Sequence, residues 1–159
     1  MHSFHTVRYL QEVTLPAIRE GAEKSGRNAD DVQLSCAIFV VTGRNEEEMR
    51  NSAIAAKSQI AFYASTPSYA PVMQLHGWDD IQAKLSQMAR EGRWNEMWQE
   101  VTDEMLETIA VVAPPDELPY KVKERYEGIL SRVGYYLPYE PQDEQLSYVW
   151  QAAAKAFRE

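Results

Sequence analysis

Two histidines near the start of the chain are the first residues whose type and spacing could do chemistry. His2 and His5 lie three positions apart, so a helix there would place both imidazoles on one face. A metal site would need carboxylate or thiolate ligands at ligand spacing nearby, and the flanking sequence offers none, so we expect no metal. The alternatives that remain are two polar residues at a frayed terminus, or a pair that hydrogen-bonds a ligand and moves protons near neutral pH.

A second group of candidate residues combines aromatic rings with hydroxyl groups where two expected helices meet. It consists of Tyr63, Ser65, Thr66, Tyr69 and His76. Side chains of this kind can stack on a flat ring and hydrogen-bond its polar edge. The structural alternative is local, because Thr66 is well placed to cap a helix and His76 falls near a helix C-terminus.

The single cysteine is expected to be a structural residue of the core and not a reactive one. Cys36 lies in an apolar run without a basic residue beside it, where a buried thiol behaves as a small hydrophobic group. One cysteine also excludes an internal disulfide framework, which favours a cytoplasmic protein.

The composition narrows the class of protein. The chain of 159 residues is 45% hydrophobic and 25% charged, as expected for one globular domain with its own core. A net charge of −8 and singly scattered Lys and Arg residues argue against a nucleic-acid partner. No apolar run approaches the roughly 20 residues that cross a bilayer, and the opening MHSFHTVRYL lacks the apolar segment of a secretory signal, so we expect neither membrane insertion nor export.

The first element that could position these residues is a helix. Thr6 can cap it and Gly26 can end it, while Pro16 predicts a kink or a fresh start inside it. Apolar residues at spacings of three and four predict one buried face, made of Val7, Leu10, Val13, Ala17, Ile18 and Ala22. Residues 32–41 follow, rich in β-branched side chains and without a charged residue, and are the clearest strand of the sequence.

Residues 45–107 are predicted to form a series of helices. Asn45 and Glu48 make a capping-box arrangement, and the helix after them has a buried face of Met49, Ala53, Ala56 and Ile60. Thr66 and Asp79 are expected to cap two shorter helices.

The rest of the chain continues the helical pattern. Residues 94–107 predict a further helix with one apolar side, made of Trp94, Met97, Val101 and Met105. The tryptophans at 78, 94 and 98 are expected to fill the core. Residues 116–127 and 143–157 predict the last two helices.

The number of strands is small for a parallel α/β fold. Beside residues 32–41, a strand is predicted at 132–137, and residues 109–112 are a weaker candidate. Parallel strands need neighbours on each side and helices on both faces, which two or three strands do not provide for a complete sheet. We therefore expect the chain to be part of a larger fold.

Three stretches resemble the C-terminal half of luciferase-like monooxygenases, and in particular the subgroup that uses the deazaflavin coenzyme F-420. They are HSFHTVRYLQEVTLPAIREGAEKSGR, QIAFYASTPSYAPVMQLHGWDD and AVVAPPDEL. The most specific part is FYASTPSY…HGW followed by GRW, because helix formation does not dictate that combination of aromatic residues, Gly and Pro. The resemblance runs from His2 to about Tyr139.

The resemblance implies a partial (β/α)₈ barrel, helix-rich and with two or three parallel strands, formed by the whole chain as one domain. Residues 32–41 would be the seventh barrel strand and residues 132–137 the eighth. Residues 45–107 would be the seventh helix with a helical lid over the barrel mouth. Residues 140–159 lie beyond the resemblance, and the sequence pattern predicts them to form a C-terminal tail with its helix. Residues 109–112 would be a helix exit and an extended connection rather than a strand.

The resemblance also implies an oxidoreductase. Family members transfer a hydride, or activate oxygen on a reduced flavin, with coenzyme F-420 or FMN and a small-molecule substrate. It implicates His2 and His5 as catalytic residues, because their loop would leave a barrel strand at the end where barrel active sites lie. The cofactor-binding residues that it implicates are Tyr63, Thr66, Tyr69 and His76.

The missing strands predict that the chain associates with another polypeptide. An incomplete sheet leaves free edges, so we expect the chain to form a homo-oligomer, most simply a dimer, or to pair with the missing N-terminal half-barrel. The chain offers only one wall of a cofactor pocket and no phosphate cradle. We therefore expect the chain alone to bind either cofactor weakly or not at all. The alternative to an enzyme is a catalytically inactive half-barrel that self-associates as a structural or binding module.

Overall fold

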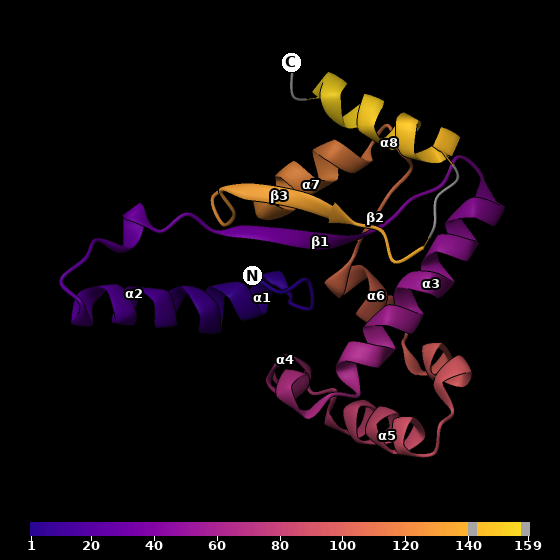
Figure 1. Ribbon diagram of the computed structural model, residues 1–159, viewed down its shortest axis with the longest axis horizontal. Helices are drawn as coiled ribbons and strands as arrows, with labels where there is room; N and C mark the ends of the chain where they lie inside the picture. The colour runs from indigo at the N-terminus through magenta and orange to yellow at the C-terminus, as the bar shows by residue number, and fades with distance from the viewer. Residues whose placement is uncertain (140–142, 157–159) are drawn as a thin grey trace.

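A three-stranded parallel sheet lies at the centre of the computed structural model, which describes residues 1–139 and 143–156, the side chains of residues 143–146 excepted. The strands are β1 (Ser35–Val41), β2 (Val111–Val112) and β3 (Arg132–Tyr136), in the spatial order β2-β1-β3 (Figure 1). β1 pairs in parallel with both neighbours, and the partners include Ser35 with Arg132, Phe39 with Tyr136, and Val40 with Val111.

Helices make up most of the described chain. The α-helices are α1 (Val7–Tyr9), α2 (Leu15–Lys24), α3 (Glu46–Ala64), α4 (Ala70–Leu75), α5 (Asp79–Arg90), α6 (Asp103–Ile109), α7 (Leu118–Tyr126) and α8 (Asp143–Ala156). A π-helical segment occupies Leu10–Thr14, and 3-10 turns occupy Ala29–Asp31, Pro67–Tyr69 and Trp94–Glu100. The predicted class, helix-rich α/β with parallel strands, is confirmed. None of the described helices has both the length and the apolar character of a membrane span.

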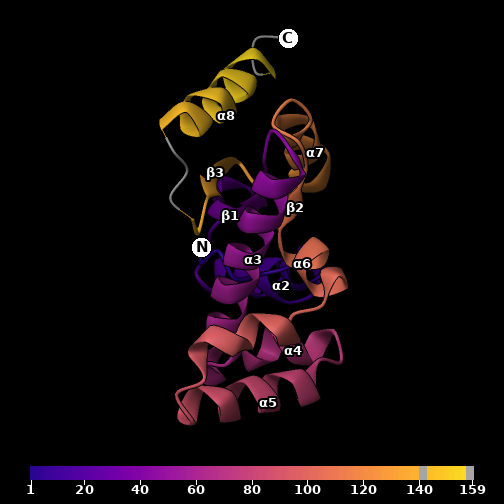
Figure 2. The same cartoon turned by 90° about the vertical axis from the view of Figure 1, so that its right-hand side faces the viewer.

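Helices cover both faces of the sheet (Figures 1 and 2). Alternate side chains of β1 separate two cores: Phe39 and Val41 pack with side chains of α3 and α6, while Ile38 and Val40 pack with those of α7. The helices α4 and α5 lie beyond α3, at the opposite end of the molecule from α8 (Figure 2). Burial on both faces explains why the β1 sequence is apolar throughout its second half.

Both strands predicted from apolar runs are present and parallel. β1 occupies the larger part of the predicted residues 32–41, and β3 falls within the predicted residues 132–137. Residues 32–34 precede the sheet, where the carbonyl of Leu34 accepts the backbone N–H groups of Ser131 and Arg132.

The prediction that residues 109–112 form a helix exit and an extended connection is wrong for residues 111 and 112. α6 does end at Ile109, but Val111 and Val112 pair with β1 as a short third strand. The backbone N–H of Ala113 also donates to the carbonyl of Val41 at 3.1 Å. A strand of two residues has no sequence period of its own, so only the pairing with β1 defines it.

The predicted interruption at Pro16 takes the form of a π-helical segment. The N–H of Leu15 donates to the carbonyl of Leu10, five residues earlier, before α2 begins. Proline cannot donate in an α-helical ladder, and a wider turn next to it accommodates the missing hydrogen bond.

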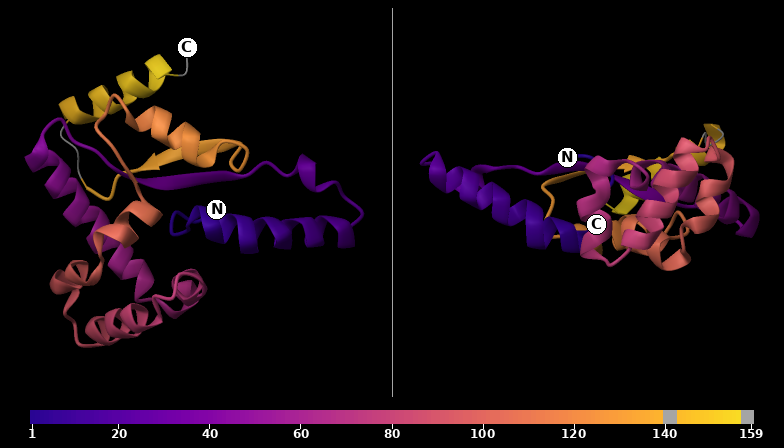
Figure 3. Two further views of the ribbon diagram at one scale, coloured as in Figure 1. Left: turned by 180° about the vertical axis from the view of Figure 1, so that it is seen from behind. Right: turned by 90° about the horizontal axis from the view of Figure 1, so that it is seen from below.

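The predicted buried face of this first helix is mostly open. Leu10 and Ala22 are buried, but Val13 is 39% exposed and Ala17 and Ile18 are not buried either. Figures 1 and 3 show α2 extending past the sheet, and its neighbours are the π-helical segment before it and the 3-10 turn after it. Its apolar stripe therefore has no complete counterpart among the described residues.

Side-chain caps follow the prediction at one helix and depart from it at the next. At the start of α3, Asn45 Oδ1 accepts the N–H of Glu48 at 2.9 Å, which confirms the cap. The cap predicted for Asp79 is wrong, because Trp78 holds the N-cap position of α5 and no side chain caps that helix.

The helix predicted at residues 94–107 is divided in two. Val101 is extended, and Thr102 Oγ1 accepts the N–H of Met105 at 3.1 Å to start α6. Trp94 is 47% exposed, against the prediction that it lies in the core, while Met97, Val101 and Met105 are buried as predicted. The last two predicted helices correspond to α7 and α8, and residue 157 lies outside the described residues.

Candidate functional site

His2 meets Tyr63 and Tyr69, although more than sixty positions of the chain separate it from either tyrosine. The His2 ring centroid is 4.7 Å from that of Tyr63, edge to face, and 4.8 Å from that of Tyr69. Phe4 completes this aromatic cluster, with its ring 5.3 Å from that of Tyr69. The structure thus unites one residue predicted to be catalytic with two predicted to bind cofactor.

Three parts of the fold position the aromatic cluster. Tyr63 lies in the last turn of α3, Tyr69 in the 3-10 turn that follows, and His2 in the segment before α1. Phe39 of β1 stands behind Tyr63, with ring centroids 6.1 Å apart, and Tyr136 of β3 packs on Phe39 at 4.9 Å. The cluster is therefore built against the sheet; Phe4 is buried, whereas the rings of His2, Tyr63 and Tyr69 are at least partly exposed.

The His2 imidazole is poised as a neutral hydrogen-bond donor. Its Nδ1 accepts the backbone N–H of Phe4 at 3.1 Å, which leaves the proton of the neutral ring on Nε2. Partial burial, and then the nearby N-terminal charge, lower the pKa of His2. A group of this kind can donate to a carbonyl or ring nitrogen at pH 7.

The phenol of Tyr136 lies beside Tyr63 and remains protonated. Burial, followed by a hydrogen bond with Tyr63, raises the pKa of Tyr136 to about 12. The Tyr136 hydroxyl can therefore donate or accept at physiological pH and carries no charge. Sequence reasoning missed Tyr136, because its approach to Tyr63 depends on the pairing of β3 with β1.

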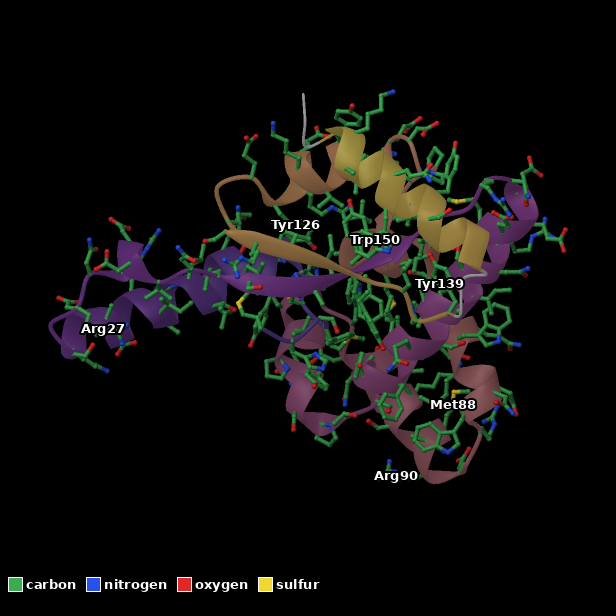
Figure 4. The ribbon with its side chains drawn as sticks, turned by 45° about the horizontal axis from the view of Figure 1, so that its top comes forward. Arg27, Met88, Arg90, Tyr126, Tyr139 and Trp150 are labelled. Carbon is green, nitrogen blue, oxygen red and sulfur yellow. The ribbon has the colours of Figure 1, made fainter. Side chains whose placement is uncertain are left out.

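His5 points to a different part of the molecule, so the prediction that both histidines share one helical face is wrong. The segment before Thr6 is not helical, and His5 is 4% exposed. Its ring lies 5.9 Å from that of Tyr126, which comes from the end of α7, on the other side of the molecule from Met88 of α5 (Figure 4). Nε2 has no hydrogen-bond partner among the described residues, and burial lowers the pKa of His5.

Cys36 has a basic neighbour that the sequence does not show. Its Sγ lies 3.5 Å from His5 Nδ1, which also lies 3.1 Å from the carbonyl oxygen of His2. Burial nevertheless raises the pKa of the thiol, and the residue is 2% exposed. A buried protonated thiol is a poor nucleophile, so the structure agrees with the interpretation of Cys36 as a small core residue.

Thr66 and His76 are not in the aromatic cluster. Thr66 holds the predicted N-cap position before Pro67, but its hydroxyl donates to the carbonyl of Phe62 at 3.3 Å and makes no capping hydrogen bond. His76 follows α4 as its C-cap, as expected, with Nε2 2.8 Å from Thr6 Oγ1 and its ring stacked on Trp78 at 4.5 Å.

The aromatic cluster fits part of a flavin-like cofactor. Partly exposed rings, phenol groups and a neutral imidazole suit a flat heterocycle and its polar edge. The turn after β1 does not fit a phosphate, because Asn45 already caps α3 and Glu46, Glu47 and Glu48 occupy its first turn. A Cβ on Gly43 would meet the α3 backbone at 2.5 Å, so no open cradle exists at that turn.

Two depressions elsewhere on the described surface contain none of the predicted site residues. One, of about 560 Å³, lies over α6, β2 and α7 and is lined by Glu107, Val111, Val112, Lys121, Glu124 and Arg125. Another, of about 440 Å³, lies between α3 and the 3-10 turn at Trp94. No group of three or more metal-ligating side chains gathers within the described residues.

Comparisons with known proteins show a family and several relatives. The sequence model of the family described as luciferase-like monooxygenase matches residues 1–132. An uncharacterized protein of Mycobacterium tuberculosis is 39% identical over 132 residues, which are 83% of this chain and 39% of that protein. The 5,10-methylenetetrahydromethanopterin reductase of Methanopyrus kandleri is 24% identical over 150 residues, 93% of this chain and 42% of that protein.

A solved structure shows the same fold. The coenzyme F-420 dependent tetrahydromethanopterin reductase of Methanopyrus kandleri superposes with a TM-score of 0.73 at 21% identity, covering 98% of this chain and 44% of that one. The chain thus spans about two fifths of the length of the curated relatives that it matches.

Proposed function

Because the chain belongs to the luciferase-like monooxygenase family, we propose that it supplies the last strands and the helical lid of a barrel oxidoreductase that uses coenzyme F-420. The observation that carries this proposal is the aromatic cluster, in which His2 meets Tyr63 and Tyr69 at partly exposed positions beside the sheet. A relative named as an F-420 dependent reductase, with the same fold, favours F-420 over FMN.

In this proposal the cofactor supplies hydride transfer, and the chain supplies position and shielding. Tyr63 and Tyr69 stack on one side of the ring system and exclude water from it. The Nε2–H of neutral His2 donates to the polar edge of the ring or to the substrate. His5 is buried away from the cluster and therefore holds its loop in place.

The site is completed by a second polypeptide segment. The apolar stripe of α2 is open at Val13 and Ala17, and Ala37 on β1 and Gly134 on β3 leave part of the sheet exposed. Surfaces of this kind need a partner. We propose the remaining part of a barrel as that partner, or else a second copy of the chain, and weak or no binding of cofactor by the chain alone.

A fluorescence titration with coenzyme F-420 tests the proposal, with FMN in parallel. It compares the isolated chain with the chain co-purified with the part of the mycobacterial relative that this chain does not match. The complex is expected to bind F-420 more tightly than a dissociation constant of about 1 µM, which is about −8 kcal/mol, and the chain alone less tightly. Formation of the complex without cofactor binding would contradict the enzyme proposal.

The exposed α2 stripe also supports a second candidate function, a catalytically inactive half-barrel that self-associates as a structural or binding module. Its expected behaviour is different: a colourless oligomer that binds neither cofactor, with or without the added segment. Because both candidates leave the isolated chain without cofactor, the F-420 titration of the completed complex separates them: tight binding supports the enzyme, and no binding supports the inactive module.

A further inference from the structure

Two hydrogen bonds join the segment around α1 to the end of α4. Thr6 Oγ1 lies 2.8 Å from His76 Nε2, and Arg8 Nη1 donates to the carbonyl oxygen of Leu75 at 2.8 Å. The residues of each pair are 70 and 67 positions apart. Both contacts link the N-terminal segment directly to the helical insertion (residues 45–107).

We propose that His76 is a positioning residue: through Thr6 it latches the helical insertion to the N-terminal segment and so holds Tyr63 and Tyr69 against His2. His2 lies four residues before Thr6, and Tyr69 lies seven residues before His76. Residues 2–6 and residues 69–76 therefore contact each other at both ends, through the aromatic cluster at one end and the Thr6–His76 hydrogen bond at the other. His76 thus acts on the cluster without touching the proposed cofactor.

The direction of the Thr6–His76 hydrogen bond follows from the other bond that Thr6 makes. Thr6 is 1% exposed, and its Oγ1 already accepts the N–H of Tyr9 at 3.1 Å as the cap of α1. The hydroxyl hydrogen needs an acceptor within this buried site, and His76 Nε2 is placed to accept it. The latch is then complete when His76 is neutral with its proton on Nδ1.

The backbone presets the orientation of His76. Gly77 adopts a φ of 70°, which ends α4 with a left-handed turn. The N–H of Trp78 returns to the carbonyl of Met73 at 3.0 Å, and the indole stacks on the imidazole with 17° between the ring planes. His76 is therefore held on one side by Trp78 and on its edge by Thr6.

Arg8 supports the same connection from the surface. Its guanidinium donates to Leu75, whose carbonyl lies at the C-terminus of α4, where a positive charge is favourable. Glu12 holds the guanidinium in place with a 2.8 Å contact. The charged groups that face His76 are Arg8 from α1, Glu12 from the π-helical segment and Glu104 from α6.

The latch is expected to weaken in acid. A protonated His76 no longer accepts from Thr6, so the buried hydroxyl loses its acceptor, and the new charge lies near Arg8. Burial first, and then Arg8, lower the pKa of His76, while Glu12 and Glu104 act in the opposite direction. The effect on a cofactor site rests on the proposed function, whereas the latch itself does not.

Hydrogen–deuterium exchange of the full chain without any cofactor tests the latch. His76→Ala is expected to speed exchange in residues 1–9 and 61–76 together, by about twofold to about tenfold, as the loss of one hydrogen bond predicts. His76→Gln, whose amide oxygen can accept from Thr6, is expected to restore slow exchange and to remove the acid dependence. Gln74→Ala, on the exposed side of α4, is the matched control and is expected to leave exchange unchanged.

Faster exchange confined to α4, or equal exchange in the Ala and Gln variants, would overturn the latch. If His76→Ala fails to fold, Arg8→Ala removes the second hydrogen bond from an exposed side chain and is expected to loosen the same two segments. Unchanged exchange in that variant would count against the proposal as well. A confirmed latch together with no cofactor binding by the completed complex would refute the proposed function alone.

Discussion

Replacing Gly43 by alanine is expected to destabilise the junction that places α3 on the sheet. A Cβ at this position would lie 2.5 Å from Met49 N and 2.7 Å from both the carbonyl carbon and the Cβ of Glu48. Two of these three atoms belong to the α3 backbone, so no side-chain rotation relieves the contact. Either the end of β1 or the first turn of α3 has to move.

Overpacking of this kind costs about 1–3 kcal/mol of unfolding free energy. For a chain of this size, each kcal/mol lowers the melting temperature by about 2–4 °C. Gly21→Ala is the matched control, because a Cβ at that position would have nothing within 4 Å and the φ of Gly21 is not positive. Gly21 lies inside α2, so that variant is expected to gain about 0.5–1 kcal/mol.

Thermal and urea unfolding followed by circular dichroism measure both changes. The expected order of stability is Gly21→Ala above the parent chain and Gly43→Ala below it. A Gly43→Ala variant as stable as the parent, beside a Gly21→Ala variant that behaves as expected, would show that the β1–α3 junction is wider than described. Such a result would remove the basis for the position of Tyr63 as well.

Three further predictions concern the stability of the chain in acid, the reactivity of the Cys36 thiol and the oligomeric state. Burial lowers the pKa of all three histidines below the unfolded value of 6.5, so the folded state binds fewer protons in acid. The contribution of the neutral histidines to the free energy of unfolding is thus retained above pH 6.5 and lost as the pH falls below it. Urea midpoints should therefore fall between about pH 7.5 and about pH 5.5, and a constant midpoint would contradict this. Cys36 should react with a thiol reagent far more slowly in the folded chain than in urea, and equal rates would show that it is accessible. The chain should form a homo-oligomer in light scattering, and a stable monomer of 18.2 kDa at high micromolar concentration would count against it.

The sequence predicted those elements that are defined by neighbouring residues, such as an apolar run or a helix cap. The apolar run at residues 32–41 indicated β1 because that strand is buried on both faces over most of its length. The cap at Asn45 was predictable because its donor lies three residues away. The open α2 stripe was not, because the helical period shows which side is apolar and not whether this chain provides a surface to cover it.

The candidate site was predictable only in part, because most of its contacts are distant in sequence. Aromatic and hydroxyl residues could be singled out by type, and two of them, Tyr63 and Tyr69, do meet His2. The contact of His5 with Cys36 spans 31 positions and that of His76 with Thr6 spans 70, so neither leaves a pattern in the sequence. Tertiary packing therefore places both histidines outside the aromatic cluster that His2 forms with Tyr63 and Tyr69.

The central claim, that the aromatic cluster forms one wall of a cofactor site, is tested most directly by a single dissociation constant. That constant is the affinity of the completed complex for coenzyme F-420 when Tyr69 is replaced by alanine, with Tyr120→Ala, exposed on α7, as the control. The account predicts that Tyr69→Ala weakens binding about tenfold, or about 1.4 kcal/mol, as the loss of a stacked ring implies, and that the control has no effect. Equal affinity of Tyr69→Ala and the parent complex would contradict it.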